Sequence, residues 1–215
     1  VTGSRLTATA HVQTSESRYA ADNDSFVRNK AVSGLNKMIM LVNGYRVGTP
    51  VLPTGIGYVA QALEDAGFDY EVSDVNIHSH AQIVEWINVI KPKFVGLGTM
   101  TFEVEKNYEL LQAIKSAFPA VITILGGPHA IAAGQDIFRE CPAVDMVIQG
   151  EGEESLVKLL NGSPLESIPG VMVRHSGTMS PPYEALNISR VAFPRYHKFN
   201  LENYGNTMSL ASSRG

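Results

Sequence analysis

The feature that most restricts the fold is an alternation between short apolar runs and helical periodicity, repeated five times over residues 37–162. The apolar runs predict buried strands over residues 38–42, 70–75, 94–97, 121–125 and 146–148. Helical spacing follows each run, from Ile56 to a stop at Gly67 and then over residues 81–90, 103–118, 131–139 and 153–160. Strands that alternate with helices form parallel sheets with right-handed crossovers, covered on both faces. The sequence therefore predicts an α/β fold, a flavodoxin-like doubly wound sheet of five parallel strands in the order 2-1-3-4-5.

The flanking segments have a different character. Residues 1–36 are rich in small polar side chains and are interpreted as an N-terminal extension, ahead of an α/β domain over residues 37–162. Residues 163–215 are expected to form a β-hairpin, with one arm at 170–174 and a turn at Ser176-Gly177, followed by a proline-containing connector. Because the first residue is Val1 and the connector leads onward, the sequence is expected to be a piece of a longer protein.

Composition excludes several classes of function. The 17 basic and 21 acidic residues give a net charge of −4, so no cationic surplus is available to bind nucleic acid. No apolar run reaches the roughly 18 residues of a membrane span, which predicts a cytoplasmic protein with no membrane contact. The single cysteine, Cys141, excludes an internal disulfide and a metal site built from several thiolates, and it is expected to pack as a small apolar residue.

Small residues and backbone donors gather where the predicted strands end. In a sheet of this order, ligands bind at the carboxyl ends of the strands, near the point between strands one and three where the strand order reverses. Glycine allows a ligand to approach the backbone closely. We therefore expect a large, flat ligand at this edge. The candidate cofactor-binding residues are Tyr45, Arg46, Thr54, Gly55 and Gly57 after strand one, Thr99, Met100, Thr101 and Phe102 after strand three, Gly126, Gly127, Pro128 and His129 after strand four, and Gly150, Glu151, Gly152 and Glu153 after strand five.

Other chemical readings find little support. The sequence has neither a complete dinucleotide fingerprint nor a Walker lysine nor a nucleophile elbow. Asp74 is interpreted as a cap or solvated residue, and His78 and His80 as loop residues rather than metal ligands. For His129 a role at the ligand and a structural role remain open. No catalytic or metal-binding residue is assigned.

Four segments together resemble a known family. They read PTGIGYVA at 53–60, VGLGTMT at 95–101, LGGPHA at 125–130 and DMVIQGEGE at 145–153. In order and spacing they are similar to the cobalamin-binding domain that precedes radical-SAM domains, as in anaerobic magnesium-protoporphyrin monomethyl ester cyclases and B12-dependent radical-SAM methyltransferases. The resemblance extends to the end of the chain, where MSLASSRG at 208–215 looks like the approach to the family's Cys-x3-Cys-x2-Cys motif.

The resemblance implies a cobalamin cofactor with its base displaced. The nucleotide tail would lie near residues 99–101 and Gly126-Gly127, and the cobalt would face Tyr45 and Arg46. Residues 43–48 read NGYRVG, so the Asp-x-His-x-x-Gly motif that supplies a histidine ligand in other corrinoid proteins is absent. The 4Fe-4S cluster and S-adenosylmethionine would belong to a missing C-terminal radical-SAM domain, the expected partner of this chain, which would act on a small-molecule substrate.

Three functions are compatible with these observations. The first is a module, not itself catalytic, that presents methylcobalamin for methyl transfer or cyclisation at an unactivated carbon. The second is the same fold without a corrinoid, serving substrate recognition or assembly. The third is a flavin-binding or signalling domain, which is disfavoured because Asn43 and Gly150 stand where signalling domains carry an acidic cluster and a lysine.

Overall fold

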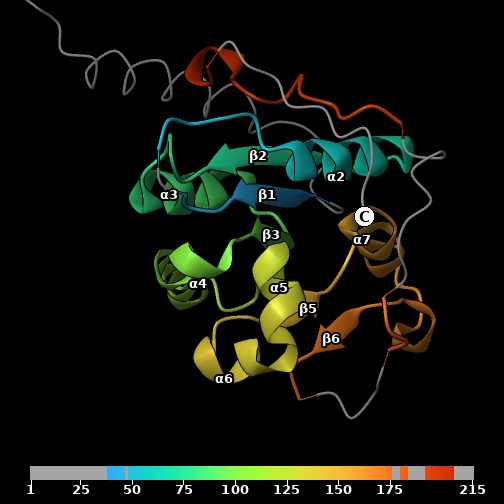
Figure 1. Ribbon diagram of the computed structural model, residues 1–215. Coiled ribbons are helices and arrows are strands. Elements are labelled where there is room, and N and C mark those ends of the chain that lie inside the picture. The colour runs from blue at the N-terminus through green and yellow to red at the C-terminus, as the bar shows by residue number, and fades with distance from the viewer. Residues whose placement is uncertain (1–37, 47, 176–179, 184–191, 206–215) are drawn as a thin grey trace, which may run out of the picture. The chain divides into compact units, whose positions relative to one another are not determined.

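The computed structural model describes residues 38–46, 48–175, 180–183 and 192–205 (Figure 1). The predicted N-terminal extension, the hairpin turn with its second arm, and the approach to the cysteine motif lie outside the described residues.

Within these residues, six strands form one sheet in the order β2-β1-β3-β4-β5-β6. The first five strands are parallel, which confirms the predicted flavodoxin-like order. Their bounds are Ile39–Asn43 for β1, Tyr70–Asp74 for β2, Phe94–Gly98 for β3, Ile122–Gly126 for β4 and Met146–Ile148 for β5.

The sixth strand corrects the predicted strand count. β6 (Val171–Val173), expected to be a hairpin arm outside the sheet, instead pairs antiparallel with β5. Arg174, directly after β6, fixes the end of this strand, because its guanidinium donates hydrogen bonds to the carbonyls of Phe138, Cys141 and Val144. A three-residue apolar run gives no sequence signal that separates these two arrangements.

Helices follow the strands in the predicted order. They are α2 (Thr54–Asp65), α3 (His80–Ile90), α4 (Val104–Ala117), α5 (Pro128–Ala133), α6 (Ile137–Glu140) and α7 (Gly152–Leu160). α2 packs against α7, and α3 packs against α4 (Figure 1). Of the helices described, none combines the length and the apolarity that crossing a bilayer requires.

The prediction of a single helix over residues 131–139 is wrong. The structure has α5 and α6 there, separated by a 3-10 turn that starts at Gly134. Gly134 has φ 53° and ψ −127°, a conformation that side-chain-bearing residues rarely adopt, so the helix breaks at this glycine. The first of the two helices also starts earlier than predicted, because Pro128 has no backbone N–H and suits a first helical turn.

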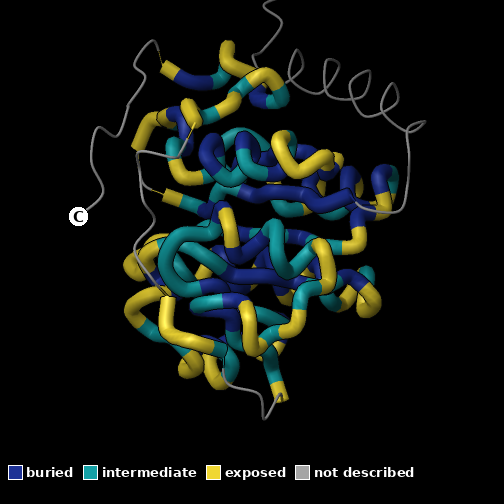
Figure 2. The backbone as a smooth tube through the Cα atoms, turned by 90° about the vertical axis from the view of Figure 1, so that its right-hand side faces the viewer, coloured by how far each residue is buried: buried dark blue, intermediate teal, exposed yellow. Residues whose placement is uncertain are grey.

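The core explains why the strands are continuously apolar. Ile39, Met40, Leu41 and Val42 of β1 are all buried, and Figure 2 shows buried backbone in the interior beneath partly exposed segments. Burial of each such side chain stabilises the fold by about 1.5–3 kcal/mol. Cys141 is also buried, and burial raises the pKa of its thiol, as expected for a cysteine that packs as an apolar residue.

Beyond the strand ends, hydrogen bonds between backbone groups continue to join the loops. The N–H of Gly44 donates to the carbonyl of Gly98 over 2.9 Å, and the N–H of Thr99 donates to the carbonyl of Gly126 over 3.0 Å. A Cβ atom at Gly44 would collide with the Gly98 carbonyl oxygen. The loops after β1 and β3 therefore meet at the point where the strand order reverses.

We predict that Gly44→Ala lowers the free energy of unfolding by about 1–3 kcal/mol, because the added methyl group forces the ends of β1 and β3 apart. Gly55→Ala is the matched control, since a Cβ there would have nothing within 4 Å and alanine favours helix α2. Urea unfolding of both variants tests this. Equal stability of the two variants would contradict the steric argument.

A second prediction concerns His78, whose Nδ1 lies 3.1 Å from Ser73 Oγ and whose ring packs edge-on against Trp86. Burial lowers the pKa of His78 below its ordinary value of 6.5, although Asp74 opposes the shift. Because the unfolded chain takes up this proton first, acidification through about pH 6.5 favours unfolding. Urea unfolding at about pH 7.5 and about pH 5.5 should show a steeper loss of stability in the wild type than in His78→Gln. Identical losses would rule out this role for His78.

Candidate functional site

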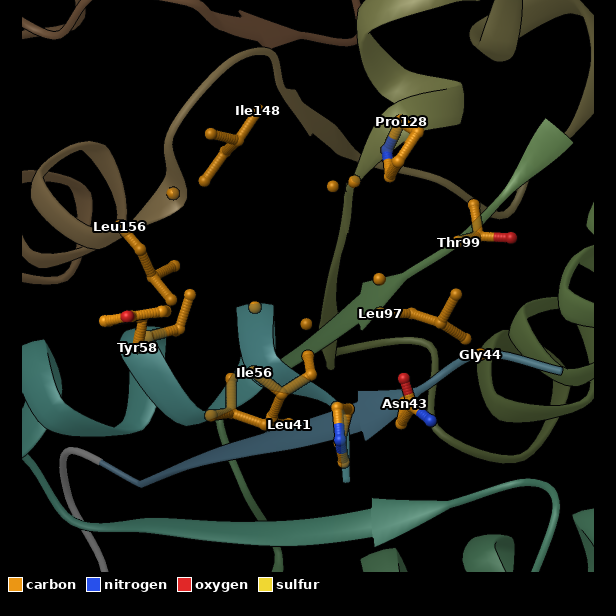
Figure 3. A pocket seen from close by; sticks show the side chains of 18 of the residues that line it. Leu41, Asn43, Gly44, Ile56, Tyr58, Leu97, Thr99, Pro128, Ile148 and Leu156 are labelled. Carbon is orange, nitrogen blue, oxygen red and sulfur yellow. The ribbon is translucent and has the colours of Figure 1, made fainter. Parts of the chain in front are cut away.

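A cavity of about 630 Å³ opens at the carboxyl edge of the sheet, and we call it the edge pocket (Figure 3). Its volume falls within the range of about 300–1,000 Å³ typical of small-molecule sites. Strand ends and the loops after them provide its walls, together with the first turns of α2 and α7. The lining residues are Leu41, Asn43, Gly44, Tyr45, Arg46, Pro53, Thr54, Gly55, Ile56, Tyr58, Val59, Gly96, Leu97, Gly98, Thr99, Met100, Ile124, Gly126, Gly127, Pro128, Ile131, Ile148, Gly150, Glu151, Gly152, Glu153, Leu156 and Tyr183.

The inner walls of the edge pocket are apolar. Ile148 projects from β5, and Ile56, Tyr58 and Leu156 project from helices α2 and α7 into the same space (Figure 3). Polar side chains such as Asn43 and Thr99 lie toward the loops. The pocket can therefore bury a flat, weakly polar group while backbone and polar groups contact its outer part.

Two neighbouring glycines have different structural roles. At Gly126 a Cβ atom would meet only the Ile148 carbonyl oxygen, at 3.9 Å, so the missing side chain leaves space. At Gly127, with φ 91°, a Cβ atom would lie 2.9 Å from both the nitrogen and the oxygen of Thr99. Gly126 therefore keeps the pocket open, whereas Gly127 lets two loops pack backbone against backbone.

Most of the candidate residues predicted from the sequence come together in the edge pocket. Thirteen of the predicted positions line it, namely Tyr45, Arg46, Thr54, Gly55, Thr99, Met100, Gly126, Gly127, Pro128, Gly150, Glu151, Gly152 and Glu153.

The other predicted positions, Gly57, Thr101, Phe102 and His129, do not line the pocket. Gly57 packs against Tyr196, whose Cε1 atom would lie 2.6 Å from a Cβ there. Phe102 is 68% exposed.

His129 is buried in a polar cluster behind the pocket wall. Its Nε2 lies 2.8 Å from the Tyr108 hydroxyl, and its Nδ1 lies 3.3 Å from Thr101 Oγ1. The Tyr108 hydroxyl also donates to Glu140, and burial and this carboxylate raise the pKa of Tyr108. Of the two roles left open for His129, the structure supports the structural one.

The apolar lining was missed by sequence reasoning, although a signal for part of it exists. Alternate residues of a strand point to the same face of a sheet, and Leu41 and Asn43 of β1 both line the pocket, as do Ile124 and Gly126 of β4. Extending each strand's alternation to its last residue would have found them. Tyr183, which comes from beyond the sheet, carries no comparable signal.

Asp74 is the centre of a hydrogen-bond network beside the pocket. It is 1% exposed, and its carboxylate accepts bonds from Asn43 Nδ2 at 2.8 Å, from the Asn76 amide groups and from the Tyr204 hydroxyl at 3.2 Å. Burial and the adjacent carboxylate raise the pKa of Tyr204, so the phenol stays protonated as the donor. Asp74 therefore stabilises the fold, but the interpretation of it as a helix cap or a solvated residue is wrong, because it is buried and Ser79 caps α3.

The site offers no evident metal centre. In the part of the chain that the structure describes, no three His, Cys, Asp or Glu side chains gather in a way that could hold a metal ion. None of the residues that line the edge pocket is a histidine. The described lining therefore supplies no imidazole ligand.

Comparison with known proteins agrees with this geometry. The curated relatives include an uncharacterized methyltransferase of Pyrococcus horikoshii, 26% identical over 74% of this chain and 36% of its own length. The anaerobic magnesium-protoporphyrin IX monomethyl ester cyclase of Cereibacter sphaeroides is 31% identical over 50% of this chain and 18% of its own length. The chain thus spans little more than a third of the first relative and about a fifth of the second.

Solved structures show the same fold. Two structures of the radical S-adenosylmethionine methyltransferase TsrM from Kitasatospora setae match with TM-scores of 0.61 and 0.57 and with 22% and 23% identity. They cover 68% and 64% of this chain and 30% and 29% of TsrM, and the second contains cobalamin and a 4Fe-4S cluster. The B12 binding domain family model matches residues 40–160, more than half of the sequence. The chain therefore belongs to the B12 binding domain family.

Proposed function

We propose that this chain is the cobalamin-binding module of a radical-SAM enzyme and that the edge pocket holds the nucleotide tail of the cofactor. The observation that carries the proposal is the edge pocket itself, about 630 Å³ in volume, with apolar inner walls and glycine backbone at its rim. Family membership and the cobalamin-containing TsrM structure support it.

The chemistry of the pocket fits the tail, which carries an apolar aromatic base, a ribose and a phosphate. The inner walls of Ile56, Ile148 and Leu156 suit the base. Thr54 and Gly55 at the first turn of α2 suit the anionic part, because no acidic residue in that turn opposes the positive end of the helix dipole. The first turn of α7 carries Glu153 and Glu154 and is less favourable to a phosphate.

Tyr45 and Arg46, in the loop after β1, are the residues that would contact the corrin ring, and the described lining of the pocket holds no histidine. Both residues line the pocket, and their backbone is held in place by neighbouring amides. The N–H of Tyr45 donates to Asn107 Oδ1 over 2.7 Å, and the N–H of Arg46 donates to Asn76 Oδ1 over 3.1 Å. The Nζ atom of Lys106 also lies 3.8 Å from the centre of the Tyr45 ring.

When bound, methylcobalamin would supply a cobalt-bound methyl group for transfer to an unactivated carbon, or would support a cyclisation. The residues of this chain bind and orient the cofactor, and the radical chemistry belongs to a radical-SAM domain outside this sequence, with its 4Fe-4S cluster and S-adenosylmethionine. In this proposal residues 37–162 form the binding domain together with β6, which pairs with β5 in the same sheet. The chain after β6 leads toward that second domain, and residues 1–36 are an extension.

Gly126→Phe should fill the edge pocket and weaken hydroxocobalamin binding at least about tenfold, or about 1.4 kcal/mol. The side chain would enter the pocket because Gly126 shares the face of Ile124 and has open space at its Cβ position. Gly127 is a poorer position, since its positive φ would strain any side chain. Absorbance titration and binding calorimetry measure the affinity, and thermal unfolding checks that the variant folds.

The matched control is Ala113→Phe, which adds the same ring at an exposed position of α4 that does not line the pocket. It should bind hydroxocobalamin as the wild type does. A wild-type protein that leaves the corrinoid spectrum unchanged and gives no binding heat would refute the proposal and favour a recognition or assembly domain. A purified protein with a yellow flavin spectrum would favour the flavin alternative.

A further inference from the structure

Asn107 is a buried amide on α4 that joins the two loops at the reversal of strand order. Its exposed fraction is 0%. Its Oδ1 accepts a hydrogen bond from the N–H of Tyr45 over 2.7 Å, and its Nδ2 donates to Thr99 Oγ1 and to the carbonyl of Glu103. One side chain therefore holds the loop after β1 and the loop after β3 at the same time.

The amide is matched to this position. Tyr45 and Thr99 both line the edge pocket, whereas Asn107 does not. A Cβ atom at Gly44 would lie 2.9 Å from Asn107 Nδ2, so the amide packs directly against the first loop. A buried amide is unfavourable unless it is hydrogen-bonded. The same helix buries leucine at Leu110 and Leu111, so an apolar side chain would suit this environment if only burial mattered.

The bond from Asn107 also fixes the Thr99 hydroxyl. Because Thr99 Oγ1 accepts from Nδ2, its own hydrogen is directed elsewhere, and it donates to the Met100 carbonyl over 3.2 Å. Two of the three Asn107 bonds reach loops that wall the pocket from opposite sides of the strand reversal. The separation of these loops thus depends on a donor and an acceptor on one short side chain.

We propose that Asn107 is a positioning residue that sets the separation of the loops after β1 and β3, and with it the affinity of the edge pocket for the nucleotide tail of cobalamin. The inference rests on the proposed function of the pocket. Leucine has a similar volume but neither donor nor acceptor. Aspartate keeps an acceptor for Tyr45 but has no hydrogen to donate to the Glu103 carbonyl and buries a charge.

Two corrinoid probes separate this role from general stability. Hydroxocobalamin carries the nucleotide tail, whereas dicyanocobinamide lacks it. The wild-type chain should prefer hydroxocobalamin. Asn107→Leu should reduce that preference at least about tenfold, because cobinamide loses only the contacts of the Tyr45 loop, whereas hydroxocobalamin also loses those of its tail. A purely structural effect would weaken both probes together, because it only lowers the folded fraction.

Ile114→Ala is the matched control, since Ile114 is a fully buried residue of the same helix that does not line the pocket. It should lower thermal stability and leave the preference between the probes unchanged. Asn107→Asp should keep part of the preference, because the bond from Tyr45 remains possible. If Asn107→Leu does not fold, the aspartate variant decides the outcome.

An unchanged preference in a folded Asn107→Leu variant, or in Asn107→Asp where leucine is not tolerated, overturns the role of Asn107 and leaves the proposed function standing. A wild-type chain that binds neither probe refutes the proposed function, and the inference falls with it. The two failures are therefore distinguishable in one set of titrations.

Discussion

The pocket depends on backbone hydrogen bonds that continue past the ends of the strands. Gly44 donates to Gly98, Thr99 donates to Gly126, and His129 donates to the carbonyl of Thr99 over 3.1 Å. These bonds tie together three loops that would otherwise diverge from the twisted sheet, and their polar groups are satisfied without side chains. The loops are consequently held close to one another while the space in front of the strands stays open.

This arrangement explains why the glycines along the edge are not equivalent. Gly44 and Gly127 lie where a Cβ atom would strike the backbone of a neighbouring loop, so they are required for closure. Gly126 and Gly98 lie where a side chain would enter the pocket, with Ile56 Cδ1 at 3.5 Å from the Cβ position of Gly98, so they keep the pocket open. Glycine thus lets neighbouring loops pack together at some positions and leaves space for a ligand at others.

The order of the strands and the location of the site could be predicted because both follow from periodicity and from the geometry of parallel sheets. The break at Gly134 could not, because one glycine within an apolar helical pattern does not reveal its dihedral angles. Neither could the exclusion of Gly57 and His129 from the pocket, which depends on Tyr196 and Tyr108, remote in sequence. The burial of Asn107 could not be predicted either, because the sequence pattern of an amide on a helix is that of an exposed residue until its hydrogen-bond partners are known.

Residues 192–205 contact helix α2 and strand β2, and they share a hydrogen-bond partner with the edge pocket. Arg195 donates to Gln61 and pairs with Glu64 on α2, and Lys198 donates to the Tyr70 carbonyl over 2.7 Å. Exposed ion pairs of this kind contribute little stability, whereas the buried bond from Tyr204 to Asp74 is protected from water. Asp74 also accepts from Asn43, which lines the edge pocket. One buried carboxylate oxygen therefore accepts hydrogen bonds both from the lining of the edge pocket and from the 192–205 segment.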